Sequence, residues 1–423
     1  MKKILITLII FITSLVVVES IFDLVSLKKK SEKIKLLKEV KTSYHHFTLK
    51  YIEVPVFSKY GAIVSFKKDL IYISGDSEFF ILKKNKNSNE YFFTSLKIDK
   101  IKNNKDKFVN KNQEELGHIA DDLFGVKDIL IENFNSFEKK VIIVSSLDYL
   151  DEKNCYKISL FLTEIIDEDT FKVDKWKKIF SSKKCLTINL TQNPKFAAYS
   201  AGGRISKLDE NNIIFTIGDF FADGKNGPIL SQDLENHYGK ILKVNIMNNS
   251  YEIFSFGHRN PQGLYIDKKK NIFSTEHGPR HGDEINLIMQ DKNYGWPKAS
   301  FGTSYVSPKW PLDETNSTHD NYEKPILSFG NTIGISNLIV YEGNYFDRWK
   351  NNLVVSTLAS QKLIRLVFNE QKKSIIYIEN IPIKKRIRDI VEFNGGKIAL
   401  LTDRGNPPDN NPQIIIFDKY KSE

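Results

Sequence analysis

Three stretches of the chain repeat one pattern: GAIVSFKKDLIYIS at residues 61–74, GRISKLDENNIIFT at residues 203–216 and QGLYIDKKKNIFST at residues 262–275. Each begins with a short apolar run, continues through a polar turn, and finishes with a second apolar run that ends in Ser or Thr. Short apolar runs separated by Asn, Asp, Gly and Lys turns are typical of paired β-strands. The body of the chain is therefore predicted to be all-β.

Looser copies of this unit begin near Gly125, Ile335 and Asp389, so the unit occurs six times at a spacing of roughly 60–70 residues. Six such units predict a six-bladed β-propeller, in which each blade is a four-stranded sheet beside a central channel. A single blade cannot bury both of its faces, so the ring must close as one unit. A β-sandwich with Greek-key connections is the alternative, but it does not explain the repeat.

The N-terminal region differs from this body. An apolar run at residues 4–18 follows two lysines, and its length suits a signal peptide and is short for a membrane span. We predict that residues 1–27 form an apolar helix. It is either a signal peptide or an uncleaved anchor, in which residues 4–27 contact the membrane. Lysines after the run favour a cytoplasmic body, whereas a signal-type start favours export.

A basic helical stalk is predicted for residues 28–48, with Ile34, Leu37 and Val40 on one side, and the propeller for residues 49–423. The formal net charge is +10, but residues 1–50 contain ten Lys and four acidic residues, which leaves about +4 for the body. A field this weak does not suit a phosphate backbone, so no nucleic-acid partner is expected.

The only cysteines are Cys155 and Cys185. In an oxidising compartment they could form a disulfide, and two free buried thiols are an equally good interpretation.

Two motifs carry polar groups that suit an anionic ligand. GHRNPQG contains Arg259, Asn260 and Gln262, which are a forked cation and two amides able to bind carboxylates and carbonyls. RIRD contains Arg386 and Arg388, which lie two residues apart and therefore on one face of a strand.

A third motif, TEHGPRHGDEINL, is rich in oxygen ligands. Gly278 and Pro279 form a turn whose carbonyls could face a cation, and Asp283 and Glu284 supply adjacent carboxylates. Ligation by oxygen alone suits calcium. Zinc is not expected, because the two histidines of this motif flank a Gly-Pro turn that no helix spans.

Taken in order, these motifs resemble the soluble aldose sugar dehydrogenase family, also called the glucose/sorbosone dehydrogenases. The resemblance extends from about Gly202 to Asp403, and more weakly from Gly61. It is carried by GGR at 202–204, TIGD at 216–219, QDL at 232–234 with GK at 239–240, HRNPQG at 258–263, EHGP at 276–279 with DE at 283–284, NYGWP at 293–297, and RIRD at 386–389.

The resemblance implies a six-bladed propeller that uses pyrroloquinoline quinone (PQQ) and calcium. Such a protein oxidises the C1 hydroxyl of aldoses to the lactone by hydride transfer to PQQ. Arg259, Asn260 and Gln262 would hold the quinone, while Arg386 and Arg388 would bind its carboxylates and dioxygens.

The same resemblance implies two calcium positions. The carbonyls of Gly278 and Pro279 would hold the calcium that polarises the quinone. Asp283, Glu284 and the carbonyl of Tyr294 look like ligands of a second, structural calcium. The family also implies export, so a periplasmic or extracytoplasmic location is expected.

Two positions depart from the family pattern. The family has a catalytic His two residues before its Gly-Gly-Arg, where this chain has Ser200, and it often has a Lys where this chain has Ala359. A neutral serine is a poor base, and losing a general base typically costs about 10²–10⁴ in rate. Asp219 matches an acid near the substrate site and is the second candidate catalytic residue.

The predicted function is therefore that of a PQQ-dependent aldose sugar dehydrogenase-like protein with a sugar substrate. The alternative is a non-catalytic propeller that binds PQQ, a sugar or another ligand. A propeller esterase is a weaker alternative, because it would not need the arginine-rich motifs.

Overall fold

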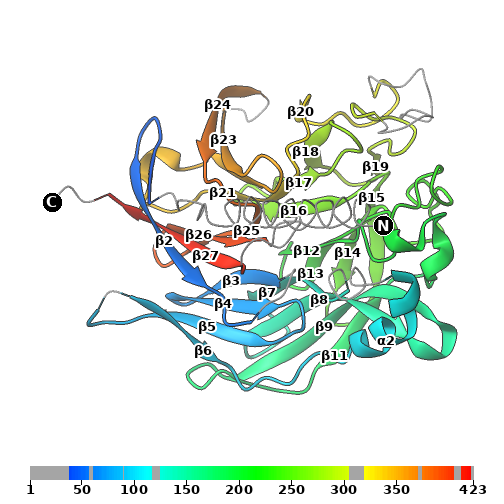
Figure 1. Ribbon diagram of the computed structural model, residues 1–423, viewed down its shortest axis with the longest axis horizontal. Coiled ribbons are helices and arrows are strands. Elements are labelled where there is room, and N and C mark those ends of the chain that lie inside the picture. Colours follow the sequence, from blue (N-terminus) through cyan, green and yellow to red (C-terminus); the bar gives the residue numbers. More distant parts are fainter. Residues whose placement is uncertain are drawn as a thin grey trace, which may run out of the picture. The chain divides into compact units, whose positions relative to one another are not determined.

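The computed structural model describes residues 38–56, 61–88, 90–116, 124–303, 319–369, 374–403 and 411–420. Within these ranges the chain is almost entirely β, and its strands form six sheets around a common centre (Figure 1). The one α-helix of the described residues is α2 (Lys105–Leu116), which follows the first sheet and buries Phe108 and Leu116. The apolar helix predicted for residues 1–27 lies outside the described residues.

The first three sheets follow one another along the chain. The first contains β3 (Gly61–Phe66), β4 (Asp69–Ser74), β5 (Phe79–Lys84) and β6 (Tyr91–Ser95). The second contains β7 (Val126–Glu132), β8 (Val141–Leu150), β9 (Cys155–Asp167), β10 (Lys172–Val173) and β11 (Lys177–Ser181). The third contains β12 (Gly202–Lys207), β13 (Asn212–Ile217), β14 (Lys240–Asn245), β15 (Tyr251–Phe256) and β19 (Lys292–Asn293).

The remaining three sheets complete the set. The fourth contains β16 (Pro261–Ile266), β17 (Ile272–Glu276), β18 (Asp283–Ile288) and β20 (Leu327–Phe329). The fifth contains β21 (Ile335–Val340), β22 (Leu353–Thr357), β23 (Lys362–Phe368) and β24 (Ile375–Pro382). The sixth contains β25 (Ile387–Phe393), β26 (Lys397–Thr402), β27 (Gln413–Lys419), β2 (His46–Glu53) and β1 (Glu39–Lys41).

The first strand of each repeat is the innermost strand of its sheet. Strands β3, β7, β12, β16, β21 and β25 each contact the next in this order, and β25 contacts β3, so the ring is closed. All six repeat starts found in the sequence fall within two residues of the start of one of these strands. The prediction of a six-bladed propeller is confirmed, and the β-sandwich alternative is wrong.

The sixth sheet joins both ends of the described chain. β2 pairs antiparallel with β27, with Leu49 opposite Phe417. The helical stalk predicted for residues 28–48 is therefore wrong from Glu39 onward, and residues 28–37 lie outside the described residues. Val40 and Phe47 are buried as alternate residues of strands, and this period-2 pattern places their side chains in the core.

Each sheet lies between two neighbours, which explains why the second strand of a repeat is apolar on both faces. In β4, Leu70 and Tyr72 pack in one cluster with side chains of β26, whereas Ile71 and Ile73 pack in another with side chains of β8. Alternate residues of one strand thus serve two interfaces. A continuous apolar run is the sequence pattern that this double burial requires.

Cys155 and Cys185 form a disulfide, with their Cα atoms 5.6 Å apart. It lies beside a pair of backbone hydrogen bonds between Tyr156 and Leu186. The Tyr156 hydroxyl accepts a hydrogen bond from the backbone N–H of Ala198 at 3.1 Å. The disulfide therefore holds Leu186 beside Tyr156, whose hydroxyl contacts the start of the segment at residues 198–201.

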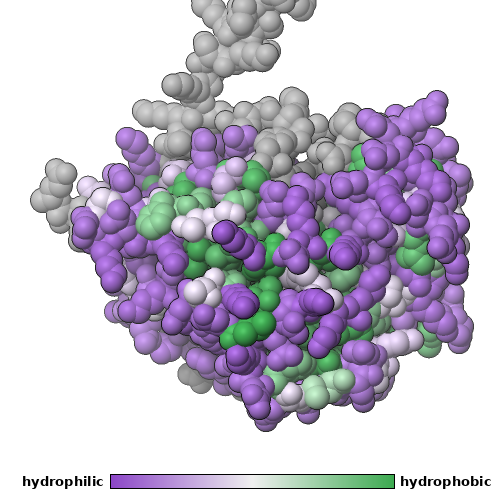
Figure 2. Space-filling model, turned by 90° about the horizontal axis from the view of Figure 1, so that it is seen from below, coloured by the Kyte–Doolittle hydropathy of each residue, from purple (hydrophilic) through white to green (hydrophobic). Residues whose placement is uncertain are grey.

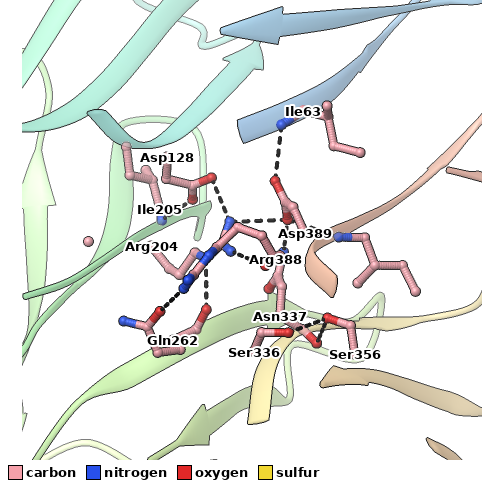
Figure 3. A network of polar contacts seen from close by, with 12 residues as sticks. Ile63, Asp128, Arg204, Ile205, Gln262, Ser336, Asn337, Ser356, Arg388 and Asp389 are labelled. Atoms are coloured by element: carbon pink, nitrogen blue, oxygen red, sulfur yellow. Dashed lines mark hydrogen bonds and ion pairs between the residues drawn. The ribbon is translucent and has the colours of Figure 1, made fainter. Parts of the chain in front are cut away.

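Buried polar groups join the six innermost strands at the centre of the ring (Figure 3). We call Asp128, Arg204, Asn337 and Asp389 the central polar network. Arg204 Nη1 lies 3.1 Å from a carboxylate oxygen of both Asp128 and Asp389. Its Nε and Nη2 donate to the backbone carbonyls of residues 262 and 388 at 2.8 and 3.0 Å.

Asp389 extends this network to the two strands that Arg204 does not reach. It accepts hydrogen bonds from the Ile63 backbone N–H at 3.0 Å and from Asn337 Nδ2 at 2.6 Å. Burial raises the pKa of Asp128 to about 6, while the nearby Arg204 guanidinium opposes the shift. One arginine and two carboxylates therefore connect all six blades.

On the face shown in Figure 2 hydrophilic residues predominate, with apolar residues between them. Among the described residues no helix combines the length and apolarity that crossing a membrane requires. The predicted membrane segment, residues 4–27, lies outside this part of the chain.

Candidate functional site

Arg259 lies in the loop between β15 and β16. Its guanidinium contacts the rings of Phe221 and Trp296, with centroid distances of 5.4 and 5.3 Å. Nη1 donates hydrogen bonds to the carbonyls of His277 at 3.1 Å and Gly278 at 2.8 Å. The predicted quinone-binding arginine and the predicted calcium-binding turn are therefore in direct contact.

Asn260 and Gln262 continue this row of polar groups toward Arg388. Asn260 Oδ1 accepts from the Gly202 N–H at 3.2 Å and from Gln262 Nε2 at 2.9 Å. Gln262 Oε1 accepts from Arg388 Nη1 at 3.1 Å, although the two residues are 126 positions apart (Figure 3). Arg388 Nη2 donates to Asp403 at 2.7 Å. The ring thus brings Asn260, Gln262 and Arg388 into direct contact.

Arg386 lies just before β25 and is close to the same carboxylate. Its Nη2 is 3.8 Å from Asp403 Oδ2, and its side chain is 34% exposed, compared with 11% for Arg388. Two guanidiniums thus converge on one acid. Forked donors of this kind suit the carboxylates of an anionic ligand.

Ser200 lies on a loop that packs closely against the loop after β13. The backbone carbonyl of Ser200 accepts from the Phe220 N–H at 3.2 Å. A Cβ added to Gly218 would lie 1.9 Å from the same carbonyl, so only glycine fits there. The Ser200 hydroxyl is buried and has no hydrogen-bond partner within the described residues. Nothing in the described structure activates it as a nucleophile or base.

The backbone of these two loops is strained. Ala198, Ser200, Phe220 and Phe221 all have positive φ, at 66°, 54°, 54° and 60°. Residues other than glycine rarely adopt this region, and each instance costs about 1–3 kcal/mol and tends to occur at functional sites.

Asp219 is 1% exposed and lies between the strained loops and Arg259. Its Oδ2 accepts from Trp296 Nε1 at 2.7 Å, and its own N–H donates to the Arg259 carbonyl at 2.7 Å. Burial raises the pKa of Asp219 to about 7, with Arg259 opposing the shift and Asp223 adding to it. The carboxyl can therefore take up or release a proton near neutral pH.

Asp283, a predicted calcium ligand, faces the backbone. Its Oδ1 accepts from the Gly278 N–H at 3.0 Å, and its Oδ2 accepts from the N–H groups of Ile333, Gly334 and Ile335 at 3.1, 2.7 and 3.3 Å. Four amide donors occupy the two oxygens. The Asp283 carboxylate thus connects the Gly278 turn to the start of β21 instead of pointing toward a cation.

Glu284 lines a small cavity that is partly open to solvent, together with Glu276, Gly278, Tyr294 and His319. Burial raises the pKa of Glu284 to about 8, and the charge of Glu276 adds to the shift. Burial lowers the pKa of His319 to about 4. The 3.9 Å contact between Glu284 and His319 therefore joins two groups whose charged forms are disfavoured by burial.

The predicted calcium ligands are thus only partly brought together. Pro279 and Asp283 do not line the cavity that contains Glu284 and Tyr294. Within the described ranges no group of three or more His, Cys, Asp or Glu side chains could hold a metal ion. A cation here would depend mainly on backbone carbonyls.

Several residues of this region had no role in the sequence analysis. Glu276 and Trp296 lie inside quoted motifs, so a search for buried acids and indole donors near the arginines could have found them. Phe221 and His319 are far from Arg259 and Glu284 in sequence, and no local pattern marks them. Only the folded ring places these rings beside those charged groups.

Comparison with known sequences identifies relatives of the chain. The sequence profile of the family described as Glucose / Sorbosone dehydrogenase matches residues 125–410. An uncharacterized protein of Synechocystis is 32% identical over 228 residues, covering 48% of this chain and 54% of that protein. Aldose sugar dehydrogenase of Escherichia coli is 27% identical over 256 residues, covering 57% and 65%. Quinoprotein glucose dehydrogenase B of Acinetobacter calcoaceticus is 26% identical over 312 residues, covering 52% and 64%. The chain therefore spans only 54 to 65% of the length of these relatives.

Solved structures share the fold. A crystal structure of glucose dehydrogenase has a TM-score of 0.71 at 19% identity and covers 88% of this chain and 100% of its own. The apo form of soluble aldose sugar dehydrogenase from Escherichia coli has a TM-score of 0.68 at 19% identity, with the same coverage. The PQQ-bound aldose sugar dehydrogenase of Streptomyces coelicolor has a TM-score of 0.59 at 16% identity, covering 88% and 98%.

Proposed function

Because the chain belongs to the glucose/sorbosone dehydrogenase family, we propose that it is a PQQ-dependent sugar dehydrogenase that oxidises the C1 hydroxyl of an aldose to the lactone. The observation that carries this proposal is the row formed by Arg259, Asn260, Gln262 and Arg388. Guanidiniums and amides are the donors that a planar ligand with carboxylates and carbonyls needs. When bound, the quinone would supply the hydride acceptor.

The residues of this row have distinct tasks in the proposal. Arg386 and Arg388 bind carboxylates, since both present forked donors beside Asp403. Asn260 and Gln262 orient the ligand through their amides. Arg259 contributes a cation whose position is fixed by two aromatic rings and two carbonyls.

Proton transfer from the sugar hydroxyl is assigned to Asp219, which we expect to be a weaker base than the family's imidazole, because its carboxyl is 1% exposed and accepts from the Phe221 N–H at 3.0 Å and from Trp296 Nε1 at 2.7 Å. Ser200 stands where the family has its base, and its neutral hydroxyl, which has no activating partner within the described residues, is a poor base. The pKa of Asp219 is raised to about 7 by burial, close to the operating pH at which a general base is most effective. The hydrogen bond from its backbone N–H to the carbonyl of Arg259, a residue of the proposed quinone site, supports this assignment.

Calcium is part of the proposal at two positions. One ion would bind to the carbonyls of Gly278 and Pro279, with Arg259 Nη1 displaced from the Gly278 carbonyl that it contacts at 2.8 Å. A second ion would bind to Glu284 and the carbonyl of Tyr294. Oxygen ligands of this kind suit calcium. Asp283 is assigned a positioning role, because its carboxylate fixes the Gly278 turn through backbone amides.

An extracytoplasmic location completes the proposal. The disulfide between Cys155 and Cys185 is of a kind that persists in oxidising compartments. Residues 1–27 would direct export or tether the propeller to the membrane. The sugar and an electron acceptor would meet the protein there.

The test is reconstitution of the purified protein with PQQ and calcium, followed by dye reduction with a panel of aldoses. Arg388→Met should weaken PQQ binding, whereas Arg348→Met, which removes an exposed arginine, should not. Tight PQQ binding without oxidation of any aldose would favour the non-catalytic propeller. No PQQ binding by the wild type would refute the proposal.

A further inference from the structure

Three buried side chains form a hydrogen-bonded row beside the Arg259 loop. The Ser255 hydroxyl lies 2.8 Å from His258 Nε2, and His258 Nδ1 lies 2.9 Å from Glu276 Oε2. Ser255 and His258 are 0% exposed and Glu276 is 5% exposed. The His258 ring also stacks on Tyr294, with centroids 4.6 Å apart. The imidazole orientation is therefore fixed from both sides.

The second oxygen of Glu276 holds the loop itself. Glu276 Oε1 accepts a hydrogen bond from the backbone N–H of Arg259. The His277 N–H, one residue further, donates to the Asn260 carbonyl at 3.1 Å. The end of β17 is thus joined to two consecutive residues of the loop, Arg259 and Asn260, both of which are in the proposed quinone site.

We infer that Glu276 is a positioning residue of the cofactor site, because its carboxylate fixes the backbone of Arg259 and the ring of His258 at the same time. This inference rests on the proposed function. A carboxylate can accept from two N–H donors through two oxygens, and hydrogen bonds to a charged group are stronger than those between neutral groups. The imidazole then carries its hydrogen on Nδ1 and accepts from Ser255 at Nε2.

A catalytic Ser-His-Glu triad is the other function that this row suggests. Ser255 lies within β15 and is fully buried, so no substrate carbonyl can reach its hydroxyl. Nucleophilic catalysis needs an accessible hydroxyl. The end of the row that faces the cavity is Glu276, beside Arg259, which agrees with a role in holding the loop.

The test compares Glu276→Leu with Ser255→Ala. Both variants leave His258 without one partner, so both should lose stability. Only Glu276→Leu frees the Arg259 N–H. We expect hydrogen exchange to accelerate across residues 257–262 in Glu276→Leu alone. We expect its PQQ dissociation constant to rise by about 10-fold or more, as loss of a hydrogen bond to a charged group predicts. Ser255→Ala should keep the wild-type constant.

Glu276→Gln provides the conservative rescue. Its amide oxygen can accept from Arg259, and its NH₂ can donate to His258 if the imidazole takes the opposite tautomer. We therefore expect near wild-type exchange and PQQ affinity. If Glu276→Leu does not fold, Glu276→Asp replaces it, because the shortened carboxylate cannot reach both donors.

The outcomes separate the two proposals. Equal PQQ affinity in Ser255→Ala and Glu276→Leu, or in the wild type and Glu276→Asp, would overturn the positioning role and leave the proposed function intact. Failure of the wild type to bind PQQ would overturn the proposed function and the cofactor role of Glu276 together. Unchanged hydrogen exchange in Glu276→Leu would overturn the positioning role without reference to any ligand.

Discussion

Replacing Arg204 with Met removes the cation that joins the innermost strands. The methionine side chain has a similar length, so packing is largely retained while the charge and four hydrogen bonds are lost. Asp128 and Asp389 then remain buried together without a cation. Breaking a buried ion pair by removing one partner typically costs about 3–5 kcal/mol, a large fraction of the about 5–15 kcal/mol that stabilises a folded domain.

The loss should depend on pH. Burial already raises the pKa of Asp128 to about 6, and without Arg204 this pKa should rise further. A carboxyl with a raised folded-state pKa binds its proton more tightly in the folded protein, so stability falls as pH rises from the unfolded value toward the folded value. In the wild type this loss of stability is complete near pH 6, whereas in Arg204→Met it continues above pH 6. The deficit of the variant should therefore grow from about pH 6 to about pH 8.

Denaturant unfolding followed by tryptophan fluorescence measures the free energy of unfolding at about pH 6 and at about pH 8. Arg365→Met is the matched control, because Arg365 is also buried, with 0% exposure against 4% for Arg204, and pairs with one acid, Glu379, at 2.8 Å. Ser43 still donates to that carboxylate at 2.7 Å, so this variant should show no added loss between about pH 6 and about pH 8. A deficit for Arg204→Met below about 1 kcal/mol, or one that is constant across this range, would refute the reasoning.

Four further outcomes are expected. Ser200→His should raise aldose oxidation by about 10²-fold in dye-reduction assays, because it adds an imidazole base beside the buried Asp219, and histidine tolerates the positive φ; an unchanged rate would contradict the view that Asp219 is the weaker base. Between pH 3.8 and about 7 the wild type should lose stability as its buried Asp219 carboxyl ionises, whereas Asp219→Asn should not. Parallel thermal-unfolding profiles of the two proteins across this range would contradict this. Replacing Cys155 and Cys185 with Ser should cost about 3–4 kcal/mol in denaturant unfolding, since the bridge closes a 30-residue separation, and equal stability would exclude this contribution. Calcium chelation should lower the melting temperature, and Glu284→Gln should reduce that shift; identical curves with and without chelator would count against both calcium positions.

The repeat in the sequence predicted the number of blades because each blade obeys local rules. A strand, a polar turn and a second strand require only neighbouring residues, and the double burial of β4 is visible as an uninterrupted apolar run at residues 70–73. The end of the predicted stalk was wrong for the opposite reason. Val40 and Phe47 become core residues only because β27, more than 360 positions later, provides the edge on which β2 pairs.

The residues of the candidate site were likewise predictable only in part. The amide of Gln262 and the guanidinium of Arg388 were predictable as ligand groups, because motifs report which donors are present. The orientation of Asp283 was not, since an acidic pair beside a turn looks the same whether its oxygens face a cation or an amide. The decisive donors are the N–H groups of residues 333–335, which reach Asp283 only when the fourth and fifth blades pack together.

The backbone of the proposed site is fixed by Arg204, the arginine of the central polar network. The carbonyl of Gln262 accepts from Arg204 Nε, while its side chain accepts from Arg388. The carbonyl of Arg388 accepts from Arg204 Nη2, while its guanidinium extends to Asp403. Both residues thus have their main chain bound to the central polar network and their side chains in the proposed quinone site. Arg204→Met should therefore weaken PQQ binding as well as stability, even though Arg204 is buried and contributes no side-chain contact to the row itself.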